Sequence, residues 1–354
     1  MRLVSTEELK EGMTIAKTVY TANGTTIINE GIKLKKSYIE KLKKLGISKV
    51  YVKDIHIKLE VKDVIKEETR RESLILVKNI MDDLRFSEDI PIDEVKSKVS
   101  EIIEQLMEND EILINLSEIR SIDDYTFGHS VNVCVLSLIT GISMGYTKNE
   151  LLDLGIGAML HDIGKVKVPS KILNKPSKLT QDEYEEIKNH TIYGYKLLSK
   201  VEGISELSRK IVLSHHERVD GKGYPYGLKN EDIHPFSKIV SVADVYDALT
   251  TDRVYKRRIK VHEAVEYMIS MSDHQFDYNI VKKFLSNIAI FPLGAAVELS
   301  TNQIGYIVDN RKEFPTRPVV EVVASNNGKK ITIPYKIDLL KNTSVVIVNT
   351  IDDI

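Results

Sequence analysis

The stretch of residues 151–160 is apolar at most of its positions and ends directly in His161 and Asp162. Its pattern predicts a buried helix, so a charged pair stands where the core would otherwise take another apolar side chain. Burying that pair without a partner would cost several kcal/mol. A metal ion would supply the partner. Imidazole nitrogen and carboxylate oxygen, without thiolate, suit iron, manganese, cobalt or zinc better than calcium or a structural zinc.

Histidine is concentrated in one region of the chain. Of the nine histidines, five stand out in a segment that reads as helix from about residue 121 to 289: His129, His161, His190, His215 and His216. Any one of them alone would more often be an ordinary surface or core imidazole. The adjacent pairs His161-Asp162 and His215-His216 favour metal binding for the group.

Two further acids stand in a predicted apolar helix, residues 239–249. Asp244 and Asp247 are three residues apart, which places both on one helical face. They could serve a metal and a water or ligand, respectively. The competing interpretation is an exposed polar stripe, which suits Asp247 better than Asp244, because Asp244 interrupts a run that reads as core.

The composition limits the kinds of partner. Hydrophobic residues make up 42% and charged residues 29% of the 354, which predicts a folded chain long enough for two or three units. The net charge of −2 and a pI of about 6.5 provide no overall positive field for a nucleic acid polymer or an anionic membrane. An anionic ligand would have to be met by local cations.

Cysteine usage and the apolar segments indicate a compartment. The only cysteine, Cys134, excludes an intramolecular disulfide and suits a reducing environment. The start of the chain lacks an apolar signal core, and polar residues interrupt the longest apolar stretch, residues 131–146. We therefore expect a cytoplasmic protein without membrane insertion.

Four segments differ in pattern. Residues 1–56 predict a small α+β domain, with a hairpin turn at Asn23-Gly24. Residues 57–120 are charge-rich and predict a helical connector. Residues 121–289 predict an all-helical domain, and residues 290–354 turn to short strands that predict a small barrel-like β domain. The expected fold class is therefore mainly α.

Two local patterns refine this division. Thr147 and Thr180 each begin a Ser/Thr-x-x-Glu capping box and so place two helix starts. The connector could pair with a second copy as a coiled coil and give a homodimer. Because its heptads are irregular, a solvated helical hairpin is the competing interpretation.

The motifs, taken in order, resemble a known family. The order His129, His161-Asp162, Asp244 is similar to the metal pattern of the HD phosphohydrolase superfamily. The runs that resemble its HD-GYP subfamily are His161-Asp162-Ile163-Gly164-Lys165, and His215-His216-Glu217 followed by Gly223-Tyr224-Pro225. The resemblance spans about residues 121–289, roughly half of the chain.

The resemblance implies two divalent metal ions, expected to be iron or manganese. One would be held by His129, His161, Asp162 and Asp244, and the other by His190, His215 and His216, with Asp162 bridging. Some family members carry a third metal, with a glutamate four residues before the first histidine, but that position here is Tyr125. Two metals are therefore expected.

The resemblance also implies a phosphodiesterase mechanism. Two metals would lower the pKa of a bridging water, bind a phosphate oxygen and offset developing charge. Asp162 and Lys165 are the expected catalytic residues, with Lys165 stabilising the nucleophile or the phosphate. Contacts with the substrate are expected from Gly223, Tyr224, Pro225, Asp247, Arg253 and Lys256. Tyr224 would stack on a purine, and Arg253 and Lys256 would contact phosphate or guanine.

The leading hypothesis is hydrolysis of cyclic di-GMP to linear pGpG, and on to GMP. Pocket chemistry alone would allow another cyclic dinucleotide, such as cyclic GMP-AMP. A receptor that binds the dinucleotide without cleaving it is the alternative from a different class. All seven presumptive metal ligands are present, which favours the enzyme.

Overall fold

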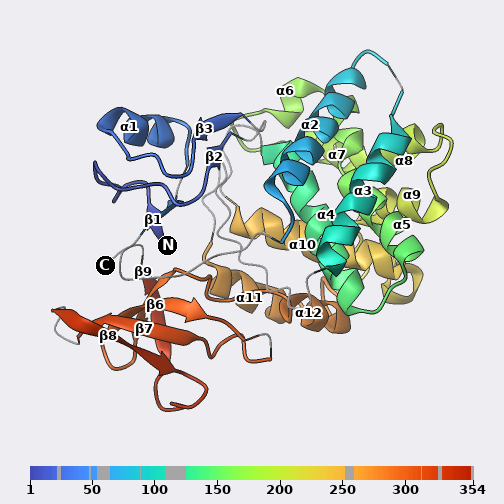
Figure 1. Cartoon of the computed structure of the whole chain (residues 1–354). Helices are drawn as coiled ribbons and strands as arrows, with labels where there is room; N and C mark the ends of the chain where they lie inside the picture. Colours follow the sequence, from blue (N-terminus) through green and yellow to red (C-terminus); the bar gives the residue numbers. More distant parts are fainter. Residues whose placement is uncertain are drawn as a thin grey trace. The chain divides into compact units, whose positions relative to one another are not determined.

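The structure is a computed structural model. It describes residues 1–21, 25–47, 49–53, 64–87, 89–108, 125–251, 259–311, 313–325 and 329–351. The described residues form two compact units (Figure 1). The first unit contains the described residues within 1–64 and 286–354. The second unit contains the described residues within 65–112 and 124–285. No helix in the described ranges is both long and apolar enough to cross a membrane.

The N-terminal part of the first unit is small and mixed, as expected. Its elements are β1 (Arg2–Ser5), β2 (Val19–Tyr20), β3 (Thr26–Ile28), α1 (Lys36–Lys44) and β4 (Lys49–Val52). Strands β1 and β4 pair antiparallel, as do β2 and β3. The predicted turn residues Asn23 and Gly24 lie outside the described residues. Their flanking strands nevertheless meet as the hairpin signal predicted.

The C-terminal part of the same unit is an antiparallel sheet. Its strands are β5 (Ala296–Leu299), β6 (Ile304–Asp309), β7 (Val319–Ala324), β8 (Lys330–Asp338) and β9 (Ile347–Ile351). They lie in the order β8-β7-β6-β5-β9, over a core that includes Val297, Ile307 and Val320. The strands are those expected, but the sheet is not a closed barrel. Pro334 lies in β8 and lacks a backbone N–H, which suits an edge strand rather than a closed ladder.

The second unit is helical. In chain order its elements are α2 (Glu67–Asp83), α3 (Ile92–Met107), α4 (Tyr125–Ser143), α5 (Lys148–Met159), η1 (Ile163–Lys167), α6 (Ser170–Leu173), α7 (Gln181–Lys188), α8 (His190–Leu198), α9 (Glu206–Ser214), η2 (Asn230–Asp232), α10 (Pro235–Thr250), α11 (Val261–Ser270) and α12 (Tyr278–Leu285). Helix α4 packs against α2, α5, α10 and α12. Helix α8 packs against η1 and α9.

Both predicted capping boxes are present. Thr147 precedes α5, and its backbone N–H donates to Glu150 Oε2 at 2.8 Å. Thr180 precedes α7 and has the same reciprocal pair with Glu183. Hydrogen bonds from Thr147 hold the pKa of the Glu150 carboxyl below its usual value, against the effect of burial. Two helix starts in the site-bearing unit are therefore set by local sequence.

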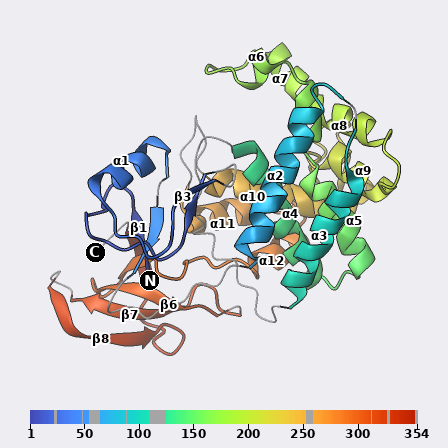
Figure 2. The ribbon, with the colours of Figure 1, turned by 45° about the horizontal axis from the view of Figure 1, so that its top comes forward.

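Helices α2 and α3 pack with the helical core rather than apart from it. They lie beside α4 and α5 (Figure 2). The apolar stripe of α3 is buried at Val95, Val99, Ile102, Ile103 and Leu106. The domain boundary that we propose near residue 120 thus separates, along the sequence, two parts that pack together in space.

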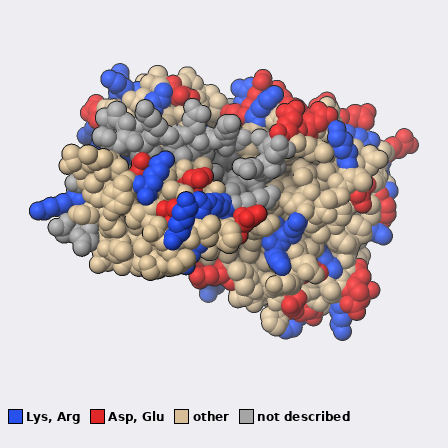
Figure 3. Space-filling view, turned by 60° about the horizontal axis from the view of Figure 1, so that its bottom comes forward, with Lys and Arg blue, Asp and Glu red and all other residues tan. Residues whose placement is uncertain are grey.

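Charged side chains of both signs are scattered over one face of the molecule (Figure 3). On the face shown in Figure 3, Lys and Arg side chains lie close to Asp and Glu side chains rather than in a separate field of one sign. This agrees with the near balance of 50 basic and 52 acidic residues in the sequence.

Gly155 allows α5 to approach its neighbours closely. A methyl group there would overlap Cγ1 of Val99 in α3 and press on Leu138 in α4. We expect Gly155→Ala to lower the free energy of unfolding by about 1–3 kcal/mol through overpacking. Urea denaturation measures this effect. Val99→Ala alone should also lower the free energy of unfolding, because it removes buried apolar contacts. In the Gly155→Ala/Val99→Ala double variant the overlap is relieved, so the total loss should be smaller than the sum of the losses in the two single variants. Additive losses would show that α3 does not pack on α5 at this point.

Candidate metal centre

The structure brings all seven predicted metal ligands together from five places in the helical unit. His129 lies in α4, His161 and Asp162 in the turn between α5 and η1, His190 at the start of α8, His215 and His216 at the end of α9, and Asp244 in α10. Within the described ranges they form two groups whose potential ligand atoms lie within 4.8 Å of one another. One group is His129, His161 and Asp244, and the other is Asp162, His190, His215 and His216.

Asp162 belongs to the group of His190, His215 and His216, and it also faces the group of His129, His161 and Asp244. Its Oδ2 is 3.3 Å from His161 Nε2, and its Oδ1 is 3.4 Å from His190 Nε2. Oδ2 also lies 3.9 Å from His129 Nε2. One carboxylate oxygen therefore faces each group, which is the arrangement that a bridging ligand requires.

Backbone carbonyls orient three of the histidine rings. The Nδ1 atoms of His161, His190 and His215 lie 2.8, 2.7 and 2.9 Å from the carbonyl oxygens of the residues three positions earlier. A carbonyl oxygen can only accept, so each Nδ1 carries a proton and donates it. The Nε2 lone pairs are thereby left for a cation. Each ring takes this orientation because its histidine lies at a helix end, against the carbonyl oxygen three positions earlier.

His129 is oriented by a carboxylate instead. Its Nδ1 lies 2.8 Å from Asp247 Oδ2, while its Nε2 lies 3.0 Å from Asp244 Oδ1. Asp247 is fully buried, and its Oδ1 also accepts a hydrogen bond from Thr251 at 3.5 Å. Asp247 thus contacts His129, and its contact with the substrate stays a prediction. Because it shares a helical face with Asp244, it lies behind His129, where it can orient the ring and raise its basicity.

Two buried atoms of the centre have no hydrogen-bond partner in the described structure. They are His161 Nε2 and Asp162 Oδ1, and both side chains are almost completely buried. Leaving such atoms unpaired is costly, and a divalent cation would satisfy both. The nitrogen and oxygen donors, without thiolate, also fit such an ion.

The electrostatics of the centre suit cation binding. Burial lowers the pKa of His190 to about 4 and that of His216 to about 3. These imidazoles are therefore neutral near pH 7, as metal ligands must be. Burial opposes protonation of His129 too, but hydrogen bonds to Asp244 and Asp247 prevail and raise its pKa to about 9. A cation at His129 Nε2 would replace that proton.

Lys165 contacts the Asp162 carboxylate. Its Nζ lies 2.6 Å from Asp162 Oδ2, and its side chain is 26% exposed. Burial opposes ionisation of Asp162, but Lys165 and His161 together hold the pKa of that carboxyl well below its usual range. The structure thus places both expected catalytic residues in one ion pair at the centre.

Gly164 permits the close approach of two ligand-bearing elements. A methyl group there would overlap the carbonyl oxygen of His190 and the amide nitrogen of Gly194. The η1 turn therefore rests directly on the first turn of α8. Only glycine lets the Asp162 turn come this close to His190.

The loop with the predicted substrate contacts folds back onto His216. The Tyr224 N–H donates to the His216 carbonyl oxygen at 3.2 Å, and the centroids of the two rings are 4.7 Å apart. The Tyr224–Pro225 peptide bond is cis. Gly223 rests on the backbone of Glu217. Tyr224 thus contacts a candidate metal ligand, and its stacking on a base stays a prediction.

Arg253 and Lys256, which are expected to contact the substrate, lie outside the described residues. Two residues beside the loop, Glu217 and Lys188, were not identified from the sequence. Glu217 is buried, and its carboxylate accepts hydrogen bonds from two backbone N–H groups of the loop. Lys188 Nζ lies 5.7 Å from the Tyr224 ring centroid. No spacing rule identifies these two residues, although Glu217 directly follows the His215-His216 pair.

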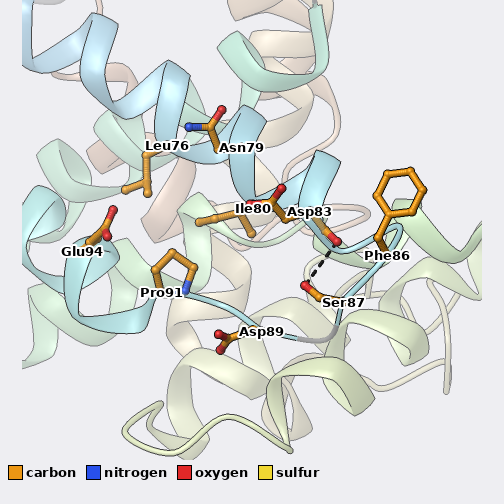
Figure 4. A pocket seen from close by; sticks show the side chains of 9 residues that line it. All are labelled: Leu76, Asn79, Ile80, Asp83, Phe86, Ser87, Asp89, Pro91 and Glu94. Atoms are coloured by element: carbon orange, nitrogen blue, oxygen red, sulfur yellow. Dashed lines mark hydrogen bonds between the residues drawn. The ribbon is translucent and has the colours of Figure 1, made fainter.

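A hollow of about 490 Å³ lies elsewhere, between the ends of α2 and α3 (Figure 4). Its lining residues are Leu76, Asn79, Ile80, Asp83, Phe86, Ser87, Asp89, Pro91 and Glu94. None is a member of either ligand group, and the hollow contributes no imidazole. We assign the chemistry to the histidine centre and none to this hollow.

Comparison with known proteins gives two family matches and several relatives. Residues 101–280 match the HD domain, and residues 296–353 match the KOW domain associated with HD domain. A cyclic di-GMP phosphodiesterase of Pseudomonas aeruginosa is 33% identical over 279 residues, which are 77% of this chain and 67% of the relative. The cyclic di-GMP phosphodiesterase PdeB of Borreliella burgdorferi is 36% identical over 59% of this chain and 54% of its own length.

A solved structure shares the fold. It is an HDG"Y"P protein from Bdellovibrio bacteriovorus, with a TM-score of 0.53 and 18% sequence identity. The match covers 80% of this chain and 97% of the other. At this identity the likeness concerns the fold alone.

Asp247 provides a test of how His129 is oriented. We expect Asp247→Asn to keep the fold but lower metal affinity by about 10–100-fold, because the amide is a weaker acceptor for His129 Nδ1. Competition with a chelator measures the affinity. The exposed acid Asp182, changed to Asn, is the matched control and should have no effect. Equal affinities in the two variants would contradict the role given to Asp247.

Proposed function

The chain belongs to the HD domain family, and from that premise we propose that it is a metal-dependent phosphodiesterase that hydrolyses cyclic di-GMP. The observation that carries the proposal is the pair of histidine and aspartate groups joined by Asp162. The first hydrolytic step would give linear pGpG, and a second would give GMP. The relatives that are cyclic di-GMP phosphodiesterases support this substrate.

The residues of the centre fit the demands of phosphodiester hydrolysis. A phosphodiester is anionic and resists attack, and divalent ions held by the seven ligands would activate water and neutralise charge on the phosphate. Asp162 keeps the two groups at a fixed spacing. Lys165, paired with Asp162, keeps that carboxylate ionised and adds a positive charge beside the scissile phosphate.

The ligand set favours an open, catalytic type of site. Seven ligands for two ions leave coordination positions for water and phosphate, which distinguishes catalytic from structural sites. We propose two ions per chain, and iron or manganese as their identity, because the donors are nitrogen and oxygen only. A non-catalytic receptor is disfavoured, since none of the seven ligand side chains is missing from the centre.

Recognition of the dinucleotide is proposed for the loop and its neighbours. Gly223, Tyr224 and Pro225 belong to a loop that folds against His216, so the substrate would lie beside the metal centre. Arg253 and Lys256 would supply the local cations that the net charge does not. Action in the cytoplasm and pairing of two chains through residues 57–120 stay predictions.

Asp162→Ala tests the centre and the activity together. We expect turnover of cyclic di-GMP to be lost and bound metal to fall, because one carboxylate serves both groups. Metal analysis, turnover and circular dichroism on the same sample measure metal, activity and fold. Asp232→Ala, at an exposed acid in η2, should behave like the unmodified chain. Undiminished turnover in folded Asp162→Ala protein would refute the site.

Metal identity is tested by reconstitution. Protein prepared without oxygen and stripped of metal should regain turnover with ferrous iron or manganese, because the donor set contains no thiolate to favour zinc. Full activity with zinc alone, and none with iron or manganese, would overturn this part of the proposal. Comparing cyclic di-GMP with cyclic GMP-AMP in the same assay separates the two substrates.

A further inference from the structure

Glu217 is a buried carboxylate next to the metal centre, and the mechanism above does not use it. Its side chain is 2% exposed. Oε1 accepts the N–H of Tyr226 at 2.7 Å, and Oε2 accepts the N–H of Leu228 at 2.9 Å. Both oxygens are thus engaged by backbone amides, and Glu217 belongs to neither ligand group. It is therefore not a metal ligand.

The two amides belong to the part of the loop that returns from Tyr224. Gly227 lies between them with a φ of +66°, a conformation that suits glycine. The same segment begins with Tyr224, whose ring packs on His216 and whose N–H donates to the His216 carbonyl oxygen. One side chain, attached directly after His216, therefore holds the far arm of the loop against its start.

The base of the loop is fixed by separate contacts. Arg218 Nη2 and Nε lie 2.8 and 3.0 Å from the Asp220 carboxylate. The backbone N–H groups of Val219 and Asp220 donate to the carbonyl oxygens of Gln275 and His274. Loss of the Glu217 contacts would therefore loosen the arm from Tyr224 to Leu228 while the base stays in place.

The Glu217 carboxylate lies close to the loop on which an anionic substrate is expected to bind. A buried carboxylate near the binding place of an anionic dinucleotide would repel the substrate if its charge faced the phosphates. Here the charge is offset by two backbone N–H donors in charge-assisted hydrogen bonds. The amide of glutamine has a single acceptor oxygen, and its NH₂ group would face an N–H donor.

We propose that Glu217 is a positioning residue for the dinucleotide. It holds the loop in the conformation that presents Tyr224 beside His216, so the surface that receives the substrate is formed before binding. Preorganisation of this kind lowers the cost of ordering a loop when a ligand binds. The proposal rests on the proposed function for the identity of the substrate.

The test compares Glu217→Gln with the matched control Glu231→Gln, which changes an exposed glutamate in η2. For cyclic di-GMP we expect KM to rise about ten-fold in Glu217→Gln, the loss of about one hydrogen bond to a charged group. Metal content, and turnover of the minimal substrate bis(p-nitrophenyl) phosphate, should stay unchanged. Hydrogen exchange at the amides of Tyr226 and Leu228 should accelerate.

A different pattern would overturn the proposal. Equal losses with both substrates, or loss of metal, would mean that Glu217 supports the fold or the metals. Unchanged KM and unchanged exchange would mean that the loop does not depend on it. If Glu217→Gln does not fold, Glu217→Asp, which is one methylene shorter, should show the same split between KM and metal content.

The readouts also separate this proposal from the proposed function. If the unmodified protein does not turn over cyclic di-GMP, the proposed function fails. The exchange rates at Tyr226 and Leu228 would still decide whether Glu217 holds the loop. Faster exchange in Glu217→Gln supports the loop contact, and unchanged exchange refutes it.

Discussion

The helical unit depends on one buried carboxylate. Asp162 stands at the end of an apolar helix, and its two oxygens face two separate groups of histidines. An ionised group at this depth is tolerated only if cations surround it. Lys165 supplies one positive charge, and the unpaired Asp162 Oδ1 and His161 Nε2 mark where a metal would supply more. The surrounding helices bring those partners to one place.

The scaffold around this carboxylate fixes the ligands before any ion binds. Helix ends place three histidine Nδ1 atoms against the carbonyl oxygens of the residues three positions earlier, and the Asp247 carboxylate holds His129 Nδ1. Gly164 removes the side chain that would keep the Asp162 turn away from His190. Because these contacts lie in a packed core, the orientation of the donor atoms follows from the fold.

Much of the centre was predictable from the sequence, because the polar pair His161-Asp162 in an apolar helix points to a cation and the resemblance to the HD-GYP subfamily implies the other ligands. The structure forms both predicted capping boxes and gathers the seven predicted ligands into two groups, while their binding of metal stays a prediction. The partner of Asp247 was not predictable, since a spacing of three residues defines a helical face but not what packs against it. Strand patterns likewise indicate the five C-terminal strands but not whether the sheet closes, which depends on long-range pairing at β8. The Glu217 side chain contacts backbone N–H groups of the loop, and a pattern of side chains along the sequence does not reveal such contacts.

We propose that two metal ions, joined by Asp162, carry the hydrolysis of cyclic di-GMP. The most direct measurement is a titration of metal-free protein with ferrous iron or manganese under anaerobic conditions, with bound metal and cyclic di-GMP turnover determined in the same samples. We expect saturation at two ions per chain, with turnover appearing only as the second ion binds. Full turnover in metal-free protein, or full turnover at saturation with a single ion, would contradict it.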